Sequence, residues 1–124
     1  RIVKLDIFKK LKEFLSECNI QFDVILIDPP SLTSSSKDVK KAKTIYSKLI
    51  ELTSPFLSQN GIFILCSCSN RIHKNEFERI CKESLTKTGK KFKKPVRLQN
   101  ETDHPVIDSF PEGDYLKAHI YFMI

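Results

Sequence analysis

Two cysteines separated by one serine, Cys66 and Cys68, are the residues with the clearest chemical potential in this chain. Cys66 ends an apolar run of the kind found in buried strands, so we expect its thiol to be a small core group. Cys68 lies beyond that run with a serine on each side, where a strand opens toward solvent. A thiol there can become a nucleophilic thiolate. The residues alone leave Cys68 open as nucleophile or packing residue.

A second candidate site is the stretch DPPS, residues 28–31, directly after the apolar stretch FDVILI. Two consecutive prolines cannot continue a ladder of strand hydrogen bonds, so the strand is predicted to end there. Asp28 then has two interpretations. It caps a turn, or it forms part of a rigid site that holds the edge of a substrate.

Strand-like and helix-like stretches alternate along the chain. We expect strands at 2–5, 22–27, 62–67, 92–99 and 116–124, with helices near 8–18, 45–56 and 75–85. The runs at 22–27 and 62–67 are typical of strands covered on both faces of a parallel sheet. This alternation predicts an α/β fold with right-handed crossovers and an antiparallel last strand.

Four connections are also predicted. Residues 31–42 are expected to form a polar loop, and SQNG at 58–61 a turn. Asn75 and Glu78 resemble a capping box that opens a helix whose core face holds Phe77, Ile80, Cys81 and Leu85. The basic stretch at 87–94 is predicted to turn around Gly89.

The carboxyl ends of the parallel strands should gather the functional residues, because ligands bind there in open α/β sheets. Asp6, DPPS and SCSN (67–70) each follow a predicted strand, and the loop 100–115 should lie at the same edge. The basic stretch 87–94 falls at the opposite edge. Four lysines at the correct edge could contact phosphates or simply form a solvated helix start; they are Lys37, Lys40, Lys41 and Lys43.

Composition narrows the class of protein. The 124 residues suggest one domain, and the net charge of +6 suits a polyanion such as RNA or simply a lysine-rich soluble surface. The four cysteines are expected as free thiols in a reducing compartment. A zinc site is disfavoured because Cys18 and Cys81 belong to helix core faces. The three glycines form no G-x-G turn for a nucleotide cofactor.

Taken in order, Asp6, DVILIDPPS, LCSCSN and DHPVIDSFPEGDYLK carry a family resemblance. The chain resembles the C-terminal half of the catalytic domain of RlmI-type ribosomal RNA large-subunit methyltransferases, which are S-adenosylmethionine-dependent and make 5-methylcytosine. The resemblance implies a partial Rossmann-like methyltransferase fold that lacks the first two strands. The sequence begins with Arg1 rather than Met, so we expect a fragment of a longer protein. The resemblance implies that those strands and an RNA-binding domain lie upstream. The first segment could then be displaced or exchanged with a second copy, which makes a homodimer a candidate assembly.

The resemblance also implies roles for individual residues. Asp6 and Ile7 match positions at the adenine of the cofactor, and Asp28, Pro29 and Pro30 match the motif between the cofactor's methyl group and the target base. Cys68 matches the catalytic cysteine. The residues expected to contact the substrate base or RNA are Pro30, Ser31, Ser69 and His104. Ser31 stands where some cytosine-C5 RNA methyltransferases carry a second cysteine, and His104 and Tyr115 either contact RNA or brace their loop.

The implied reaction needs a thiol because carbon 5 of cytosine is a poor nucleophile until a thiolate adds to carbon 6. The target base must also be unstacked to reach the site. Asp28 is expected to hydrogen-bond the cytosine edge during addition. Two alternatives remain: a methyltransferase for an exocyclic amine, which needs no cysteine, and a non-catalytic RNA-binding module. A cytoplasmic location is expected, with an organelle as the alternative.

Overall fold

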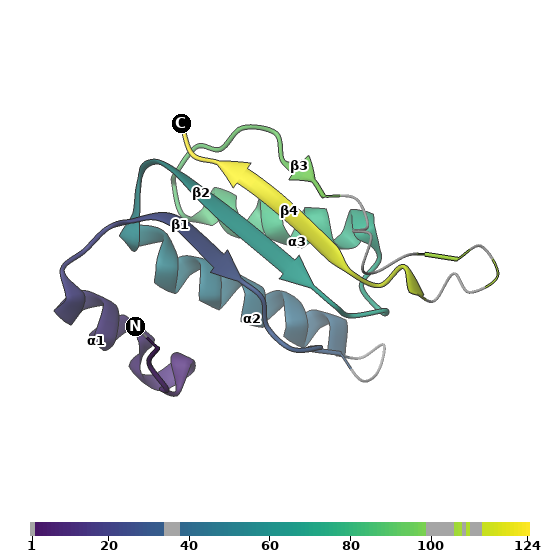
Figure 1. The fold of residues 1–124 in the computed structure, drawn as a ribbon, viewed down its shortest axis with the longest axis horizontal. Coiled ribbons are helices and arrows are strands. Elements are labelled where there is room, and N and C mark those ends of the chain that lie inside the picture. Colours follow the sequence, from purple (N-terminus) through teal and green to yellow (C-terminus); the bar gives the residue numbers. More distant parts are fainter. Residues whose placement is uncertain (1, 34–37, 99–105, 108, 110–112) are drawn as a thin grey trace.

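The computed structural model describes residues 2–33, 38–98, 106–107, 109 and 113–124. In chain order its elements are α1 (Ile7–Cys18), β1 (Phe22–Ile27), α2 (Asp38–Thr53), the short 3-10 helix η1 (Ser54–Phe56), β2 (Leu57–Ser67), α3 (Lys74–Lys87), β3 (Val96–Arg97) and β4 (Lys117–Phe122). Figure 1 shows these elements arranged around one twisted sheet. None of the described helices is long and apolar enough to cross a membrane.

The sheet has the strand order β1-β2-β4-β3. β1 and β2 are parallel neighbours joined by α2, whereas β4 runs antiparallel to both β2 and β3. β3 therefore points the same way as β1 and β2. The predicted α/β class, the crossover between the strands at 22–27 and 62–67, and the antiparallel last strand are all confirmed.

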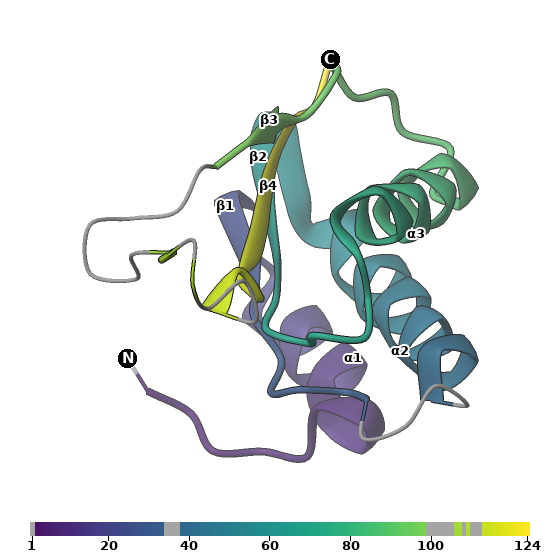
Figure 2. The same ribbon diagram turned by 90° about the vertical axis from the view of Figure 1, so that its right-hand side faces the viewer.

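The helices that the structure describes cover one face of the sheet. α2 and α3 pack side by side on that face (Figure 2). Alternate residues of β2, including Phe63 and Leu65, point into this core and are fully buried. On the other face Val24 and Leu26 are 52% and 58% exposed. The expectation that both faces of these strands are covered is therefore wrong for this chain. The core side chains are Ile27, Ala42, Tyr46, Leu49, Ile50, Leu57, Phe63, Leu65, Ile72, Phe77, Ile80, Cys81, Leu85 and Tyr121.

Two predicted strands differ from the structure for reasons of hydrogen bonding. Residues 2–5 form no strand, and Ile2 is fully exposed. A strand needs a partner for its backbone groups, and none of the described strands pairs with this segment. The strand expected at 92–99 shortens to β3 with a separate bridge between Phe92 and Met123. Pro95 lies between these pairings and cannot donate to a ladder.

Three predicted connections also changed. The loop expected at 31–42 ends earlier, because α2 begins at Asp38. The SQNG stretch is no turn but part of β2, where Asn60 has a φ of 63° and the register with β1 shifts. The capping box is absent, since His73 is the N-cap of α3 and makes no side-chain cap bond. The turn at Gly89 is confirmed, with a φ of 72° that favours glycine.

Candidate active site

The loops that follow β1 and β2 meet in one pocket at the carboxyl end of the parallel strands. The pocket has a volume of about 510 Å³ and also includes the turn before β4. Its lining residues are Ser31, Thr33, Cys68, Asn70, Arg71 and Tyr115. The DPPS and SCSN segments, distant in the sequence, therefore converge as predicted. This volume is within the range of pockets that hold small ligands.

The two cysteines of the opening motif occupy different surroundings. Cys66 is the next-to-last residue of β2 and pairs with Ala118 across the sheet. It is half-buried rather than fully buried, because it lies on the face of the sheet without helices. Burial raises the pKa of Cys66 to about 11, and the negative charge of Asp28 adds to this. Cys68 is also half-buried, but it lies beyond the strand and lines the pocket.

Asp28 lies directly after β1 with an exposed side chain. Because the preceding residue, Ile27, pairs with Leu65 of β2, Asp28 lies at the same edge of the sheet as the end of β2. Pro29 is half-buried and Pro30 exposed. Asp28 is thus available at the strand edge where the sequence placed it, and its catalytic role stays a prediction.

Ser69 is buried and connects the two loops of the pocket. Its hydroxyl hydrogen-bonds the hydroxyl of Thr33, and its backbone N–H points to the hydroxyl of Ser67 at 3.4 Å. Its carbonyl oxygen accepts a bond from the backbone N–H of Ile72 at 3.3 Å. These bonds fix the backbone next to Cys68. A contact between Ser69 and a substrate stays a prediction.

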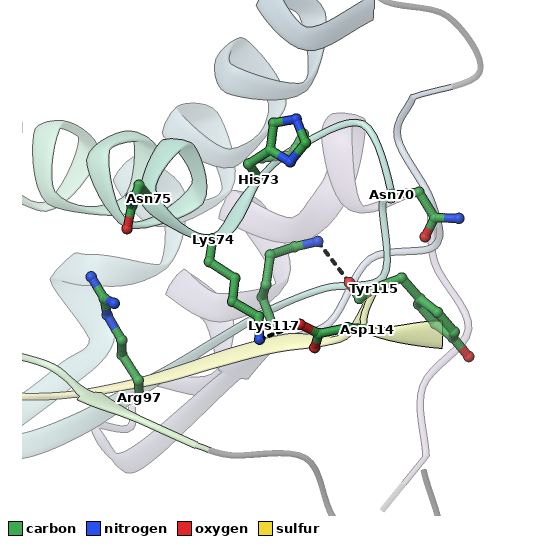
Figure 3. Close-up of a pocket in the computed structure, with 9 residues that line it drawn as sticks. Asn70, His73, Lys74, Asn75, Arg97, Asp114, Tyr115 and Lys117 are labelled. Atoms are coloured by element: carbon green, nitrogen blue, oxygen red, sulfur yellow. Dashed lines mark hydrogen bonds and ion pairs between the residues drawn. The ribbon is translucent and has the colours of Figure 1, made fainter. Parts of the chain in front are cut away.

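Lys117 is a buried cation that sequence reasoning missed. Only 4% of it is exposed, and its Nζ donates to the carbonyl oxygens of Ser69 at 2.7 Å and Tyr115 at 2.6 Å. Burial lowers its pKa to about 8, against the opposing effects of Cys68 and Asp114. Figure 3 shows its ammonium group reaching the Tyr115 backbone. Lys117 therefore joins the loop that carries Cys68 to the turn before β4.

A signal for Lys117 was present in the sequence. Alternate residues of a strand share a face, and Lys117 has the same parity as His119 and Tyr121. Both of these are buried on the helix-covered face. Ser67 and Lys117 pair directly across the sheet. A lysine at a core position near a strand end is expensive unless it is hydrogen-bonded, and this one is.

The residues expected at the cofactor lie at the start of α1. Asp6 is the N-cap of α1 and accepts bonds from the backbone N–H groups of Phe8 at 3.0 Å and Lys9 at 3.2 Å. Ile7 beside it is 40% exposed. α1 runs back along β1, so this first turn lies toward the carboxyl end of the strand (Figure 1). Their contact with a cofactor stays a prediction.

The remaining candidates fall into two groups. His104 and Lys37 lie outside the described residues. Lys40 and Lys41 are exposed near the start of α2, while Lys43 is engaged in an ion pair with Glu83 of α3. Among the residues that the structure describes, no group of three or more His, Cys, Asp and Glu side chains could hold a metal ion.

Comparison with known proteins confirms the resemblance inferred from the motifs, although no family model matches the chain. The chain is 31% identical over 113 residues to "Ribosomal RNA large subunit methyltransferase I" of Alteromonas mediterranea, and 32% identical over 116 residues to the protein of that name from Cronobacter sakazakii. These matches cover 91% and 94% of this chain but 28% and 29% of the relatives. The chain therefore spans less than a third of their length.

Solved structures agree on the fold. A protein from Streptococcus mutans, assigned as an S-adenosylmethionine-dependent methyltransferase, superposes with a TM-score of 0.70 at 25% identity over 98% of this chain and 30% of that one. SMU.776, likewise assigned as a methyltransferase and solved with S-adenosylhomocysteine, gives a TM-score of 0.69 at 22% identity over 95% of this chain and 30% of that one. The chain thus has part of the Rossmann-like fold of these methyltransferases.

Proposed function

We propose that residues 1–124 form the C-terminal part of the catalytic domain of an S-adenosylmethionine-dependent ribosomal RNA methyltransferase that makes 5-methylcytosine. The observation that carries this proposal is the shared pocket of Cys68 and Ser31, which unites the thiol with the loop that follows Asp-Pro-Pro. The names of the relatives support the substrate class. A cytoplasmic location and a homodimeric assembly are both consistent with this proposal.

The thiol explains the chemistry at carbon 5. The Cys68 thiolate adds to carbon 6 of cytosine, and the new S–C bond gives carbon 5 enamine character. Carbon 5 then takes the methyl group, loses its proton to a base, and the S–C bond breaks to restore the aromatic ring and the thiolate. S-adenosylmethionine, when bound, supplies the electrophilic methyl group.

Asp28 is the second group assigned to the reaction. It directly follows β1, whose last residue, Ile27, pairs with Leu65 near the end of β2. In the proposed mechanism the Asp28 carboxyl group accepts a hydrogen bond from the N4 amino group of the cytosine and donates a proton to N3, where negative charge develops during addition. The rigid Pro29 and Pro30 lie, in this mechanism, between the target base and the methyl donor.

The described residues fit part of a cofactor site. Asp6 presents a carboxylate at the first turn of α1, and Ile7 beside it offers an exposed apolar surface. The amino group of an adenine ring can donate a hydrogen bond to the Asp6 carboxylate, and the face of the ring can pack against Ile7. The glycine-rich turn of such sites is expected in the upstream part of the domain, which would also cover the exposed Val24 and Leu26.

Identification of the methylated nucleoside tests this function. The full-length protein is incubated with ribosomal RNA and S-adenosylmethionine bearing a deuterated methyl group, and the RNA is digested and analysed by mass spectrometry. We expect labelled 5-methylcytidine from the wild type and none from Cys68→Ala. Labelled N4-methylcytidine or N6-methyladenosine, formed equally well without Cys68, would contradict the proposal in favour of amine methylation.

A further inference from the structure

The pocket that holds Cys68 continues into two further pockets. A neighbouring pocket of about 670 Å³ shares Asn70 and Tyr115 with it. A third, of about 510 Å³, shares Lys74, Arg97 and Lys117 with the second and extends to Leu98 and Leu116. We treat these adjoining pockets as one trough that extends from Cys68 between the start of α3 and the β3–β4 edge of the sheet. Figure 3 shows its middle part, the pocket of about 670 Å³.

The walls of this trough carry an excess of positive charge. Lys74, Arg97 and Lys117 line it, while Asp114 is the acidic side chain among its described lining residues. We call Lys74 and Arg97, on its two rims, the rim cations. Their side chains are 50% and 52% exposed. Lys117 lies below them, buried and hydrogen-bonded to backbone carbonyls.

The rim cations are engaged, but weakly enough to exchange partners. Lys74 pairs with Asp114 at 2.5 Å, and Arg97 pairs with Glu78 at 2.5 Å. Half-exposed ion pairs contribute only about 0–1 kcal/mol. A phosphate group that enters the trough can therefore replace or share these partners at little cost.

We propose that the trough binds the phosphodiester backbone of the single RNA strand adjacent to the target cytidine, with the rim cations contacting its phosphates. The inference rests on the proposed function, because a base that reaches Cys68 must leave its stack and bring its flanking phosphates with it. Tyr115 offers a ring on which a neighbouring base can stack. Asn70 and Asn75 offer amides for the ribose 2′-hydroxyl groups.

The other basic regions of the chain fit this role less well. Lys43 pairs with Glu83 and lines none of the three pockets of the trough. The basic stretch 87–94 lies at the opposite end of β2, where Lys90 bonds the carbonyl of Leu57 at 3.2 Å. The trough combines positive charge with direct continuity to the Cys68 pocket.

Salt-dependent RNA binding provides the test. Full-length protein carrying Cys68→Ala, which cannot form the adduct, is compared with the same protein carrying Lys74→Ala and Arg97→Ala in addition. Binding of a ribosomal RNA fragment is measured by fluorescence anisotropy at several salt concentrations. The matched control carries Lys91→Ala and Lys93→Ala, two exposed lysines at the opposite end of the sheet. Thermal melting confirms that each variant is folded.

We expect the rim variant to bind about 20-fold more weakly at 0.1 M salt, with a salt slope smaller by about 1.4, because each single-strand phosphate contact contributes about 0.7 to the slope. The control should change affinity less than about twofold. Equal losses in both variants, or an unchanged affinity in the rim variant, would overturn the proposal. Binding is measured without turnover, so the two proposals can fail separately. If the wild type forms 5-methylcytidine but the rim variant binds RNA normally, the role of the trough is refuted and the proposed function stands. If the rim variant selectively loses RNA binding but the wild type forms no 5-methylcytidine, the proposed chemistry is refuted and the role of the trough stands.

Discussion

Cys66 and Cys68 are two residues apart but belong to different regions of the molecule. Cys66 belongs to the hydrogen-bonded body of β2, where its carbonyl oxygen accepts a bond from the Tyr46 hydroxyl at 3.0 Å. Cys68 belongs to the loop beyond the strand and faces a pocket shared with Ser31 and Tyr115. The comparison teaches that the position of a thiol relative to the strand end decides whether it belongs to the strand ladder or lines the pocket.

The loop around Cys68 is irregular but firmly held. Lys117 and Ile72 both donate to the carbonyl oxygen of Ser69, and the Ser69 hydroxyl bonds Thr33. A nucleophile must be positioned within a fraction of an ångström to be effective. Backbone pairing across the sheet fixes Cys66, whereas the hydrogen bond from the buried Lys117 to the Ser69 carbonyl fixes the loop that carries Cys68.

The largest effect is expected from removal of the Cys68 thiol. Cys68→Ala should lower the rate of RNA methylation at least about a thousandfold, because the addition at carbon 6 is lost. Single-turnover transfer of a labelled methyl group to RNA measures the rate. Cys66→Ala is the matched control and should change it less than about twofold. Comparable losses in both variants would remove the distinction between the two thiols.

The next effect concerns the buried ammonium that holds the Cys68 loop. The pKa of Lys117 is about 8 in the folded protein against 10.5 for an ordinary lysine. Between these pH values the unfolded chain binds more protons, so this group's contribution to stability rises with pH. The full change is about 3 kcal/mol. Cys68 and Asp114 oppose the shift and Lys74 adds to it.

Urea denaturation of wild type and Lys117→Met at pH 7.5 and 10.5 measures that contribution. Other titrating groups, including Tyr46 and Cys66, act in both proteins and cancel in the difference. The wild type should gain stability relative to the variant as the pH rises. A stability difference that stays constant with pH would show that Lys117 is not buried as the structure places it.

A third prediction concerns the reactivity of Cys66. Its pKa of about 11 lies two units above the ordinary thiol value of 9.0, which lowers the thiolate fraction at pH 8 about a hundredfold. Iodoacetamide should therefore alkylate Cys66 about a hundredfold more slowly in the folded protein than in urea. Peptide mass spectrometry follows each cysteine separately. Equal rates in both states would mean that β2 does not protect this thiol.

The smallest of these effects is expected from removal of the Asp28 carboxylate, directly after β1. Asp28→Asn should lower methylation about 30-fold, because a hydrogen bond to a charged group contributes about 2 kcal/mol. The thermal stability should hardly change, since Asp28 is exposed. An unchanged methylation rate would mean that Asp28 only caps a turn. The contrast between the two strand-end regions would then depend on Cys66 and Cys68 alone.

Parts of the site could be predicted because strand geometry is strict. The carboxyl ends of adjacent parallel strands share one edge, so DPPS and SCSN had to converge once both strands were recognised. The core face of α3 followed from the spacing of Phe77, Ile80, Cys81 and Leu85, all of which are buried. These conclusions needed only periodicity and chain direction.

Other parts depend on tertiary context that local patterns do not report. The parity of Lys117 with His119 and Tyr121 indicates a core position, but the carbonyl oxygens of Ser69 and Tyr115 that bind its ammonium group are known only from the structure. The SQNG stretch reads as a turn, but Leu57 and Ile62 on either side of it both pair with β1, so the stretch is an irregular, shifted part of β2. The apolar runs predicted a sheet covered on two faces, whereas Val24 and Leu26 remain exposed. We propose that the upstream part of the catalytic domain covers them.

Covalent trapping on ribosomal RNA that contains 5-fluorocytosine tests the central claim most directly. Fluorine at carbon 5 cannot leave as a proton does, so the adduct between the protein and the methylated base should persist. With full-length protein and S-adenosylmethionine, we predict a protein–RNA band that forms in wild type and Cys66→Ala and is lost in Cys68→Ala. Absence of the band from wild type with bound cofactor, or its persistence in Cys68→Ala, would contradict the assignment of Cys68 as the nucleophile.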